Sequence, residues 1–419
     1  MENKDSREYK LQSYLNKLNS NEKHEKKKKW LRVKKVVMLL AKELKSDARV
    51  CQEARSLLKY KYDITVVMWD RKGSSKRKEV YEGINVERVS LRVLFPSPCV
   101  SLLPYLGLFN LMTFLKLLLM DFDVVHCHDL DTLLAGLFAG KLKGKKVVYD
   151  AHEIYPLMVQ PYVPKIIVKM IGVVEFLLIK KVDALITVSE IFADYFKKGV
   201  LDKVNISVIM NCKDPDDFKA SRKEVTELKV RLGIENRFII LYDGWLTPDN
   251  GLEELFSAIE KLNGQIGDLM AVICGDGYAE EEFKKMVKEK NIENYVKFMG
   301  KIQSKDIPLF VNACDIMYVV YKPTNKYAFF RTPVRLFEAI IAGKPIIASN
   351  FGDVKRIVER EGIGLLIDPE KIDELCRALL RLKHDKKLKE ELSEKAIGIS
   401  KTYNWSLMEK KMLYLYEHL

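Results

Sequence analysis

Short runs of β-branched and aliphatic residues alternate with segments of helical apolar spacing from Val33 to the C-terminus. This alternation is typical of a parallel, doubly wound α/β sheet, because parallel strands need crossover connections and these are usually helices. The strands predicted on this basis are KKVVMLLA, DITVVMWD, DVVHCH, KVVYDAHE, ALITVSE and ISVIMN in the first half, and FIILYDG, MAVICGD, YVKFMG, IMYVVY, PIIAS and GLLID in the second.

The pattern breaks once and then restarts. A chain of 419 residues is too long for one ordinary domain, and the polar segment 211–225 opens with turn-forming residues. We therefore predict a basic N-terminal extension at 1–32, an α/β domain at 33–210, a linker at 211–225 and a second α/β domain from 226. Ligands of such sheets bind beyond the carboxyl ends of the strands, so two facing sheets would create a cleft.

Basic residues are concentrated at the N-terminus. The formal net charge is +13, and residues 1–35 hold 12 Lys or Arg against 5 Asp or Glu. Such a tail attracts an anionic partner, or it is only a solubilising extension. Leu11, Tyr14, Leu15 and Leu18 have helical spacing among lysines, which favours an anchor on an anionic membrane surface. No nucleic-acid-binding motif accompanies the charge, so we expect no nucleic-acid partner.

The segment Val93–Leu115 carries no charge, but Pro96, Pro98 and Pro104 interrupt it. The apolar stretch that remains before Asp121 is shorter than the ~20 residues that a membrane-spanning helix needs. We expect no transmembrane helix. The segment is either a buried helix that leads into the next strand or an apolar surface that touches lipid or a lipid-linked substrate.

The cysteines and the N-terminus indicate the compartment. The seven cysteines are widely spaced and include no C-x-x-C pair, which is typical of buried thiols in a reducing compartment. The first residues contain no apolar core of a secretory signal. We therefore expect a cytoplasmic protein, and the basic N-terminus leaves room for peripheral association with the inner face of the membrane.

Polar residues follow a strand in the segment VVYDAHE. Asp150, His152 and Glu153 are the candidate catalytic residues, because a histidine beside a carboxylate at a strand end can contact a developing charge or transfer a proton. The alternative is a buried histidine in a hydrogen-bonded turn.

The segment DVVHCHDLD offers weaker signals. His126 and His128 lie on one face of the predicted strand and could form a metal pair, and Asp129 and Asp131 resemble an aspartate pair that holds a metal–diphosphate. No further ligand is evident nearby, so we expect no metal. A capping role for the two aspartates at the start of the next helix is favoured.

Two segments of the second half can approach an anionic ligand. The glycines of Gly275-Asp276-Gly277 permit close backbone approach at a strand-to-helix turn, although an ordinary turn explains them as well. This is not the G-x-G-x-x-G pattern, so no nicotinamide dinucleotide is indicated.

The segment FFRTPVRLFEAIIAGKPIIAS is the most informative one. Thr332 fits a helix N-cap and Pro333 the first helical position, which predicts a helix that ends at Gly343. The helix N-terminus is an anion site, and Arg331 and Arg335 add two charges. Glu338 could accept hydrogen bonds from a diol such as ribose. Together these features predict a nucleoside-diphosphate site, with a salt-bridged structural helix as the alternative.

These motifs, in this order, resemble the group 1 (family 4) glycosyltransferases of the GT-B fold: DVVHCHDLD, VVYDAHE, VDALITVSE, VICGDG and TPVRLFEAIIAGKPIIASNFGDVKRIVE. The resemblance begins near Val33. It implies two Rossmann-like domains that face a central cleft, a nucleotide-sugar donor held mainly by the domain at 226–400, a terminal helix at 401–419 that crosses back to the first domain, retention of anomeric configuration and no metal cofactor.

The resemblance also implies residue roles. Glu338 would bind the nucleotide ribose, Arg335 would lie near the diphosphate, and His152 would lie near the transferring sugar. The loop Met299–Ile302 would contact the base. The donor-binding set expected from motif and resemblance together is Gly244, Gly275, Asp276, Gly277, Gly300, Lys301, Ile302, Arg331, Thr332, Pro333, Val334, Arg335 and Glu338.

Three departures from the family pattern bear on activity. Phe330 stands where the first glutamate of a Glu-x7-Glu pair is usual, Trp245 and Asn250 stand in the loop that usually supplies an arginine and a lysine, and the first βα loop lacks the common glycines. Arg331, Arg335 and Lys326 are the candidate substitutes for the missing charges.

The sequence therefore predicts a retaining enzyme that moves a sugar from a UDP- or GDP-sugar to a glycan or lipid-linked acceptor. Two alternatives remain at this point. One is a nucleotide-sugar epimerase of similar fold, and the other is a catalytically weak partner subunit, which Phe330, Trp245 and Asn250 favour.

Overall fold

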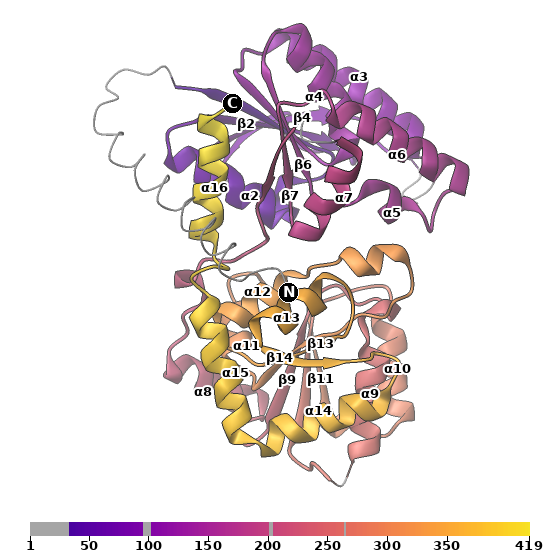
Figure 1. Cartoon of the computed structure of the whole chain (residues 1–419), viewed down its shortest axis with the longest axis vertical. Helices are drawn as coiled ribbons and strands as arrows, with labels where there is room; N and C mark the ends of the chain where they lie inside the picture. Colours follow the sequence, from indigo (N-terminus) through magenta and orange to yellow (C-terminus); the bar gives the residue numbers. More distant parts are fainter. Residues whose placement is uncertain (1–32, 95–101, 201–203, 264) are drawn as a thin grey trace. The chain divides into compact units, whose positions relative to one another are not determined.

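The computed structural model contains two compact α/β units (Figure 1). It describes residues 33–94, 102–200, 204–263 and 265–419. Unit 1 comprises residues 1–209 and 409–419, and unit 2 comprises residues 210–408. Each unit has one sheet and its own buried core, so the predicted pair of α/β domains is confirmed. The basic extension at 1–32 lies outside the described residues.

The sheet of unit 1 has eight strands in the order β3-β4-β2-β1-β5-β6-β7-β8. Every neighbouring pair is parallel except the edge pair β3–β4. The edge pair was not predicted, because polar and charged residues interrupt its apolar ones and its outer strand is partly exposed. The strands are β1 (Lys35–Leu40), β2 (Asp63–Asp70), β3 (Lys78–Tyr81), β4 (Ile84–Ser90), β5 (Val124–His128), β6 (Lys146–Ala151), β7 (Ala184–Thr187) and β8 (Asn205–Val208).

Helices cover both faces of this sheet (Figure 1). On one face α4 lies between α3 and α6, and on the other α2 lies beside the last part of α16. From Glu409 onward α16 belongs to unit 1. The helices are α2 (Ala48–Lys59), α3 (Leu103–Leu119), α4 (Leu130–Leu142), α5 (Tyr155–Val159), α6 (Lys165–Ile179), α7 (Glu190–Val200) and α16 (Trp405–Glu417).

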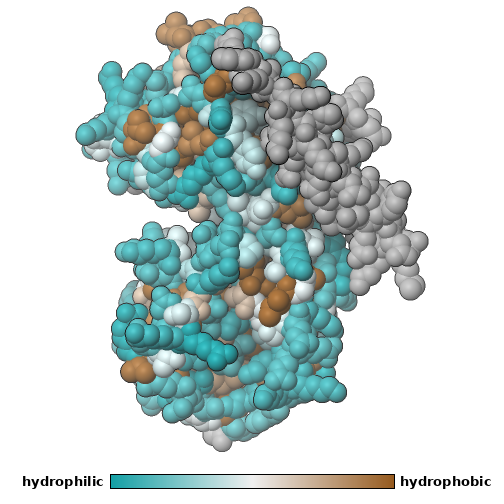
Figure 2. Space-filling model, turned by 90° about the vertical axis from the view of Figure 1, so that its left-hand side faces the viewer, coloured by the Kyte–Doolittle hydropathy of each residue, from teal (hydrophilic) through white to brown (hydrophobic). Residues whose placement is uncertain are grey.

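Helix α3 contains the later part of the apolar segment Val93–Leu115, whose residues 95–101 lie outside the described residues. Only four of its residues are buried, and most of its leucines are exposed, so the interpretation as a buried helix is wrong. Exposed leucines in such numbers are unusual for a protein surface. The side of the molecule in Figure 2, for comparison, is mainly hydrophilic, with hydrophobic residues in separate groups. Within the described part of the chain, no helix combines the length and apolarity needed to cross a bilayer.

The sheet of unit 2 is entirely parallel, in the order β11-β10-β9-β12-β13-β14. Its strands are β9 (Phe238–Asp243), β10 (Leu269–Cys274), β11 (Val296–Gly300), β12 (Ile316–Val319), β13 (Ile346–Ser349) and β14 (Gly364–Ile367). The helices around it are α8 (Arg222–Leu232), α9 (Leu252–Leu262), α10 (Glu280–Glu289), α11 (Ile307–Ala313), α12 (Val334–Ile341), α13 (Gly352–Glu361), α14 (Ile372–His384) and α15 (Lys386–Ile399).

The segment 211–225, predicted as a linker, lies within unit 2, and α8 begins inside it. The reason is a capping box, in which the Ser221 hydroxyl accepts a hydrogen bond from the Glu224 amide and the Glu224 carboxylate accepts one from the Ser221 amide. The polar residues that suggested a linker therefore start a helix.

Candidate functional site

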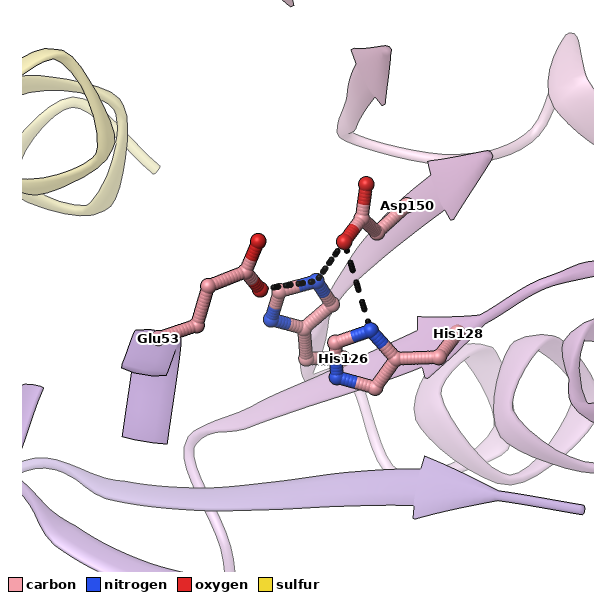
Figure 3. Close-up of side chains that lie close together, drawn as sticks. All are labelled: Glu53, His126, His128 and Asp150. Carbon is pink, nitrogen blue, oxygen red and sulfur yellow. Dashed lines mark ion pairs between the residues drawn. The ribbon is translucent and has the colours of Figure 1, made fainter. Parts of the chain in front are cut away.

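The carboxyl ends of β5 and β6 bring several buried titratable side chains together in unit 1 (Figure 3). His126 and His128 are two residues apart on β5 and so point to the same face. Asp150 is the register partner of His128 on β6, and Glu53 reaches the same place from α2. All four side chains are buried.

Arg49 joins the two carboxylates of this cluster. Its guanidinium donates to both oxygens of Asp150, at 3.2 and 3.0 Å, and its Nη2 lies 2.9 Å from Oε1 of Glu53. Burial alone would raise the pKa of Asp150, but the charges of Arg49 and His152 hold that pKa well below its usual value. Asp150 is therefore a fixed buried anion at the end of β6.

His152 and its neighbour Asp129 reach solvent, with 11 % and 17 % of their side chains exposed. The Nε2 of His152 lies 2.8 Å from Oδ2 of Asp150, and its Nδ1 lies 3.6 Å from Oδ2 of Asp129. Burial lowers the pKa of His152, but the charges of Asp150 and Asp129 outweigh burial and raise it to about 9. The structure thus brings the predicted residues Asp150 and His152 together, and Glu153 lies half-buried on the following bend.

A metal ion is the obvious alternative occupant for two imidazoles and two carboxylates. One ligand atom from each of Glu53, His126, His128 and Asp150 lies within 4.8 Å of all the others, and Zn²⁺ accepts such a donor set. However, Arg49 already forms ion pairs with both carboxylates, so a divalent cation would have to bind beside a buried guanidinium charge. The contacts therefore favour an ion-pair network.

Asp129 does not have the predicted capping role. It occupies the N-cap position of α4, but its side chain makes no capping hydrogen bond there. Its Oδ1 instead accepts a hydrogen bond from the His152 amide, at 3.0 Å. The carboxylate therefore fixes the turn after β6, because that turn passes directly over the end of β5.

The candidate donor site of unit 2 is centred on Arg335, the second residue of α12. This side chain is buried, and its guanidinium packs between the rings of Tyr242 and Tyr321, at 4.6 and 4.8 Å from their centroids. It donates to the carbonyls of Tyr318 and Asp243. Its Nη2 has no hydrogen-bond partner among the described residues, so one donor remains for a ligand.

Arg331 contacts the same Tyr321 ring, with its guanidinium carbon 4.3 Å from the ring centroid, and forms an ion pair with Asp249. The two arginines thus stand near the carboxyl ends of β9 and β12, where ligands of parallel sheets bind. The candidate substitute Lys326 is exposed on the preceding short helix, η8 (Lys326–Phe330).

Glu338 is buried one turn after Arg335, and its Oε2 has no hydrogen-bond partner among the described residues. Burial and the nearby Asp243 raise the pKa of Glu338 to about 8, against the opposing charges of Lys213 and Arg335. The Lys213 Nζ lies 4.0 Å from Oε1 of Glu338. Lys213 and Asp243 were not predicted. Lys213 was missed because it lies in the segment predicted as a linker. Asp243 could have been predicted, because it lies at the end of a strand, as Asp150 does.

The raised pKa of Glu338 predicts a pH-dependent stability. A carboxyl group whose pKa rises from 4.5 to about 8 on folding binds more protons in the native state, so the free energy of unfolding falls from pH 4.5 to 8. We expect Glu338→Gln to raise the melting temperature above pH 8 while it weakens nucleotide binding. Thermal unfolding with and without UDP or GDP measures both effects. Equal melting temperatures of the variant and the wild type above pH 8 would contradict a raised pKa of Glu338.

Steric contacts with the neighbouring backbone explain why glycine occupies positions 275 and 277. A Cβ atom on Gly275 would lie 1.9 Å from the carbonyl oxygen of Gly244, and one on Gly277 would lie 2.2 Å from that of Leu246. The close approach that we predicted is thus made by the neighbouring backbone after β9. Asp276 belongs to the same contact, since its carbonyl accepts a hydrogen bond from the Leu246 amide.

The predicted start of α12, with Thr332 as the N-cap and Pro333 as the first helical residue, is wrong by one residue. Helix α12 begins at Val334, and Pro333 is its N-cap residue without a side-chain cap, because the Thr332 hydroxyl donates to Asp353 instead. Asn250 is buried and donates to the Tyr242 hydroxyl, so it cannot replace a phosphate-binding lysine. Trp245 is exposed.

The remaining predicted donor residues lie at the end of β11. Gly300 has a positive φ of 64°, and its carbonyl accepts a hydrogen bond from the Gly275 amide. Lys301 is exposed and Ile302 is partly buried. A hydrogen bond therefore joins the two turns that follow β10 and β11, and both turns lie at the carboxyl ends of the strands, as Arg335 does.

Together, these features describe an α/β protein with one polar site at the strand ends of each unit. Comparison with known proteins identifies the class. The family model described as glycosyl transferases group 1 matches residues 224–398, and that of glycosyltransferase family 4 matches residues 48–217. The chain belongs to this family of glycosyltransferases and has the GT-B fold.

Individual relatives are distant. The chain is 25 % identical to alpha-D-kanosaminyltransferase of Streptomyces kanamyceticus over 43 % of this chain and 46 % of that protein, so it spans less than half of that relative. It is 26 % identical to UDP-Gal:alpha-D-GlcNAc-diphosphoundecaprenol alpha-1,3-galactosyltransferase of Escherichia coli over 71 % and 76 % of the two chains. The crystal structure of Anabaena HepE with UDP-glucose aligns with a TM-score of 0.72 at 20 % identity, over 92 % and 100 % of the chains.

Proposed function

We propose that this protein transfers a sugar from a nucleoside-diphosphate sugar to a glycan or lipid-linked acceptor, with retention of anomeric configuration. The observation that carries the proposal is Arg335, whose buried guanidinium keeps one donor without a partner at the strand ends of unit 2. Arg331 and the N-terminus of α12, which has no side-chain cap, add positive potential. The relative HepE was crystallised with UDP-glucose, which supports a donor of this class.

Arg335 and Arg331 would stabilise the charge that collects on the leaving diphosphate, and such preorganised donors contribute strongly to catalysis. Glu338 would accept hydrogen bonds from the ribose, and the 300–302 turn would contact the base. In a retaining transfer on one face of the sugar, the leaving phosphate takes the acceptor's proton. No carboxylate nucleophile is then required. His152 would lie beside the sugar, and Asp150 would keep its imidazole charged and oriented.

The anomeric configuration of the product tests the retaining mechanism. We expect an α-linked product from an α-configured donor, because the acceptor attacks the face from which the diphosphate leaves. Proton NMR of the purified product reports this configuration directly. A β-linked product would contradict the retaining proposal.

A lipid-linked acceptor is supported by the galactosyltransferase relative, whose name describes a diphosphoundecaprenol-linked substrate. The basic residues at 1–35 would hold the enzyme at the cytoplasmic, anionic face of a membrane. Removal of residues 1–29 is then expected to weaken binding to anionic vesicles and to spare donor hydrolysis, and unchanged vesicle binding would overturn this role.

We propose that catalysis needs no metal cofactor, since Arg331 and Arg335 would neutralise the diphosphate in place of a metal and Arg49 already pairs the carboxylates of the unit 1 cluster. Turnover should therefore persist after dialysis against EDTA, measured as release of nucleoside diphosphate. Loss of turnover that Mg²⁺, Mn²⁺ or Zn²⁺ restores would show that an ion is required.

A catalytically weak partner subunit is the second candidate, because Asn250 is engaged inside the protein and Phe330 replaces a usual glutamate. Incubation with a panel of nucleotide sugars separates the possibilities. Transfer to an acceptor supports the enzyme, binding without turnover of any donor supports the partner subunit, and an epimerised nucleotide sugar supports the epimerase considered above.

A further inference from the structure

Three neighbouring helices of unit 1 expose their apolar residues. The outward residues on each helix have helical spacing and so form one stripe per helix. They are Leu108, Leu111, Met112, Leu115 and Leu119 on α3, Leu134, Phe138 and Leu142 on α4, and Ile166, Met170, Val173, Val174 and Leu177 on α6. Because α4 contacts both other helices, the stripes form one surface, which we call the apolar face.

Helix α3 is oriented with its polar residues inward. Asn110 and Thr113 are buried, and Asn110 donates to the carbonyls of Leu106 and Asp131 and accepts from the Ala135 amide. The leucines one turn away point outward, and Leu119 is 91 % exposed. Phe109 and Leu117 are buried on the inward side as well, but a helix on a water-exposed surface does not usually expose most of its leucines. The arrangement is stable where the outside is itself apolar.

The exposed charges of these helices favour an anionic partner. Glu175, the one acidic residue of α6, is buried and accepts a hydrogen bond from the Tyr149 hydroxyl at 2.7 Å. The exposed charges of α6 and its C-terminal end are therefore all positive, on Lys165, Lys169, Lys180 and Lys181. An apolar stripe with lysines on its borders is typical of a helix that lies in the interface of an anionic bilayer.

A second copy of the chain is a poorer occupant. Dimers are commonly two-fold symmetric, and such an interface places the same patch of each copy against itself. The lysines of α6 in both copies would then border one shared buried patch, which concentrates positive charge, whereas anionic headgroups would neutralise them.

We propose that the apolar face of α3, α4 and α6 inserts into the surface of an anionic lipid bilayer. This contact goes beyond the electrostatic attraction proposed for the basic N-terminal residues. It provides the hydrophobic part of membrane binding, so binding persists in salt concentrations that screen charges.

The test uses the full chain with three substitutions, one per stripe: Leu111→Glu, Phe138→Glu and Val173→Glu. A matched control carries Val80→Glu, Val230→Glu and Ile397→Glu, which place the same three charges at exposed apolar positions elsewhere. Both variants should show the wild-type circular dichroism spectrum, because none of the six side chains is buried.

Sedimentation with phosphatidylglycerol–phosphatidylcholine vesicles in high salt is the measurement. We expect binding of the face variant to fall by about tenfold or more, while the control variant binds like the wild type. Equal loss in both variants, or none in either, would overturn the proposal. A wild-type dimer in vesicle-free solution that the face variant alone abolishes would also overturn it in favour of a second copy. UDP- or GDP-dependent thermal stabilisation, measured on the same samples, reports the donor site separately.

Discussion

Replacing Arg335 with methionine is expected to weaken nucleotide binding by about 10- to 150-fold, because the lost contacts are charge-assisted hydrogen bonds worth about 1.5–3 kcal/mol together. Turnover should fall further, by about 10²–10³, since the guanidinium would act most strongly on the charge that develops in the transition state. Methionine keeps much of the volume between Tyr242 and Tyr321, which limits the cavity left behind.

The experiment measures UDP- and GDP-dependent thermal stabilisation and the rate of donor consumption. Arg381→Ala, which removes an exposed arginine from α14, is the control for a change of net charge and should behave like the wild type. Arg335→Lys should recover only part of the loss, because an ammonium lacks the flat guanidinium face that stacks on rings and the fixed fork of donors. If Arg335→Met binds nucleotide as tightly as the wild type, the donor site lies elsewhere.

The second large effect concerns His152. We expect His152→Gln to lower transfer by about 10²–10⁴ and to leave nucleotide binding unchanged, because the residue belongs to unit 1 and the nucleotide contacts belong to unit 2. Kinetics with saturating donor, together with nucleotide-dependent stabilisation, separate the two quantities. A parallel loss of nucleotide binding would contradict the assigned role.

His152 also has a stability signature. Its pKa in the folded protein is about 9, above the ordinary value of 6.5, so the stabilisation by its charged form is complete below pH 6.5 and is lost as pH rises to 9. The His152→Gln variant should lack this loss of stability between pH 6.5 and 9. Thermal unfolding of both proteins from pH 6 to 9.5 would detect the difference. Matching pH profiles of the two proteins would contradict the charged His152–Asp150 pair.

The alternating pattern was sufficient to predict the parallel sheets and most strands, since each buried strand is a continuous apolar run. It failed at β3 and β4, where pairs of adjacent charged residues interrupt the apolar ones. The prediction of a linker at 211–225 was wrong, because polar residues such as Ser221 form loops in some proteins and cap helices in others.

The candidate site could be predicted only in part. Asp150, His152, Arg335 and Glu338 stand at strand ends or a helix start, which local sequence reveals. Arg49 and Glu53 could not be found this way, because an Arg and a Glu four residues apart on a helix look like an ordinary surface ion pair. Their burial against Asp150 depends on the packing of α2 over the sheet, and that is a tertiary property.

Incubation of the full chain with a nucleotide-sugar panel and a diphosphoundecaprenol-linked acceptor decides whether the protein transfers sugars. The measurement is mass-spectrometric detection of the glycosylated acceptor together with the released nucleoside diphosphate. We expect that at least one donor is consumed, that product and nucleoside diphosphate appear in equal amounts, and that Arg335→Met and His152→Gln both suppress them. Tight binding of a nucleotide sugar with neither product nor nucleoside diphosphate, across the whole panel and with simple glycan acceptors as well, would contradict this function.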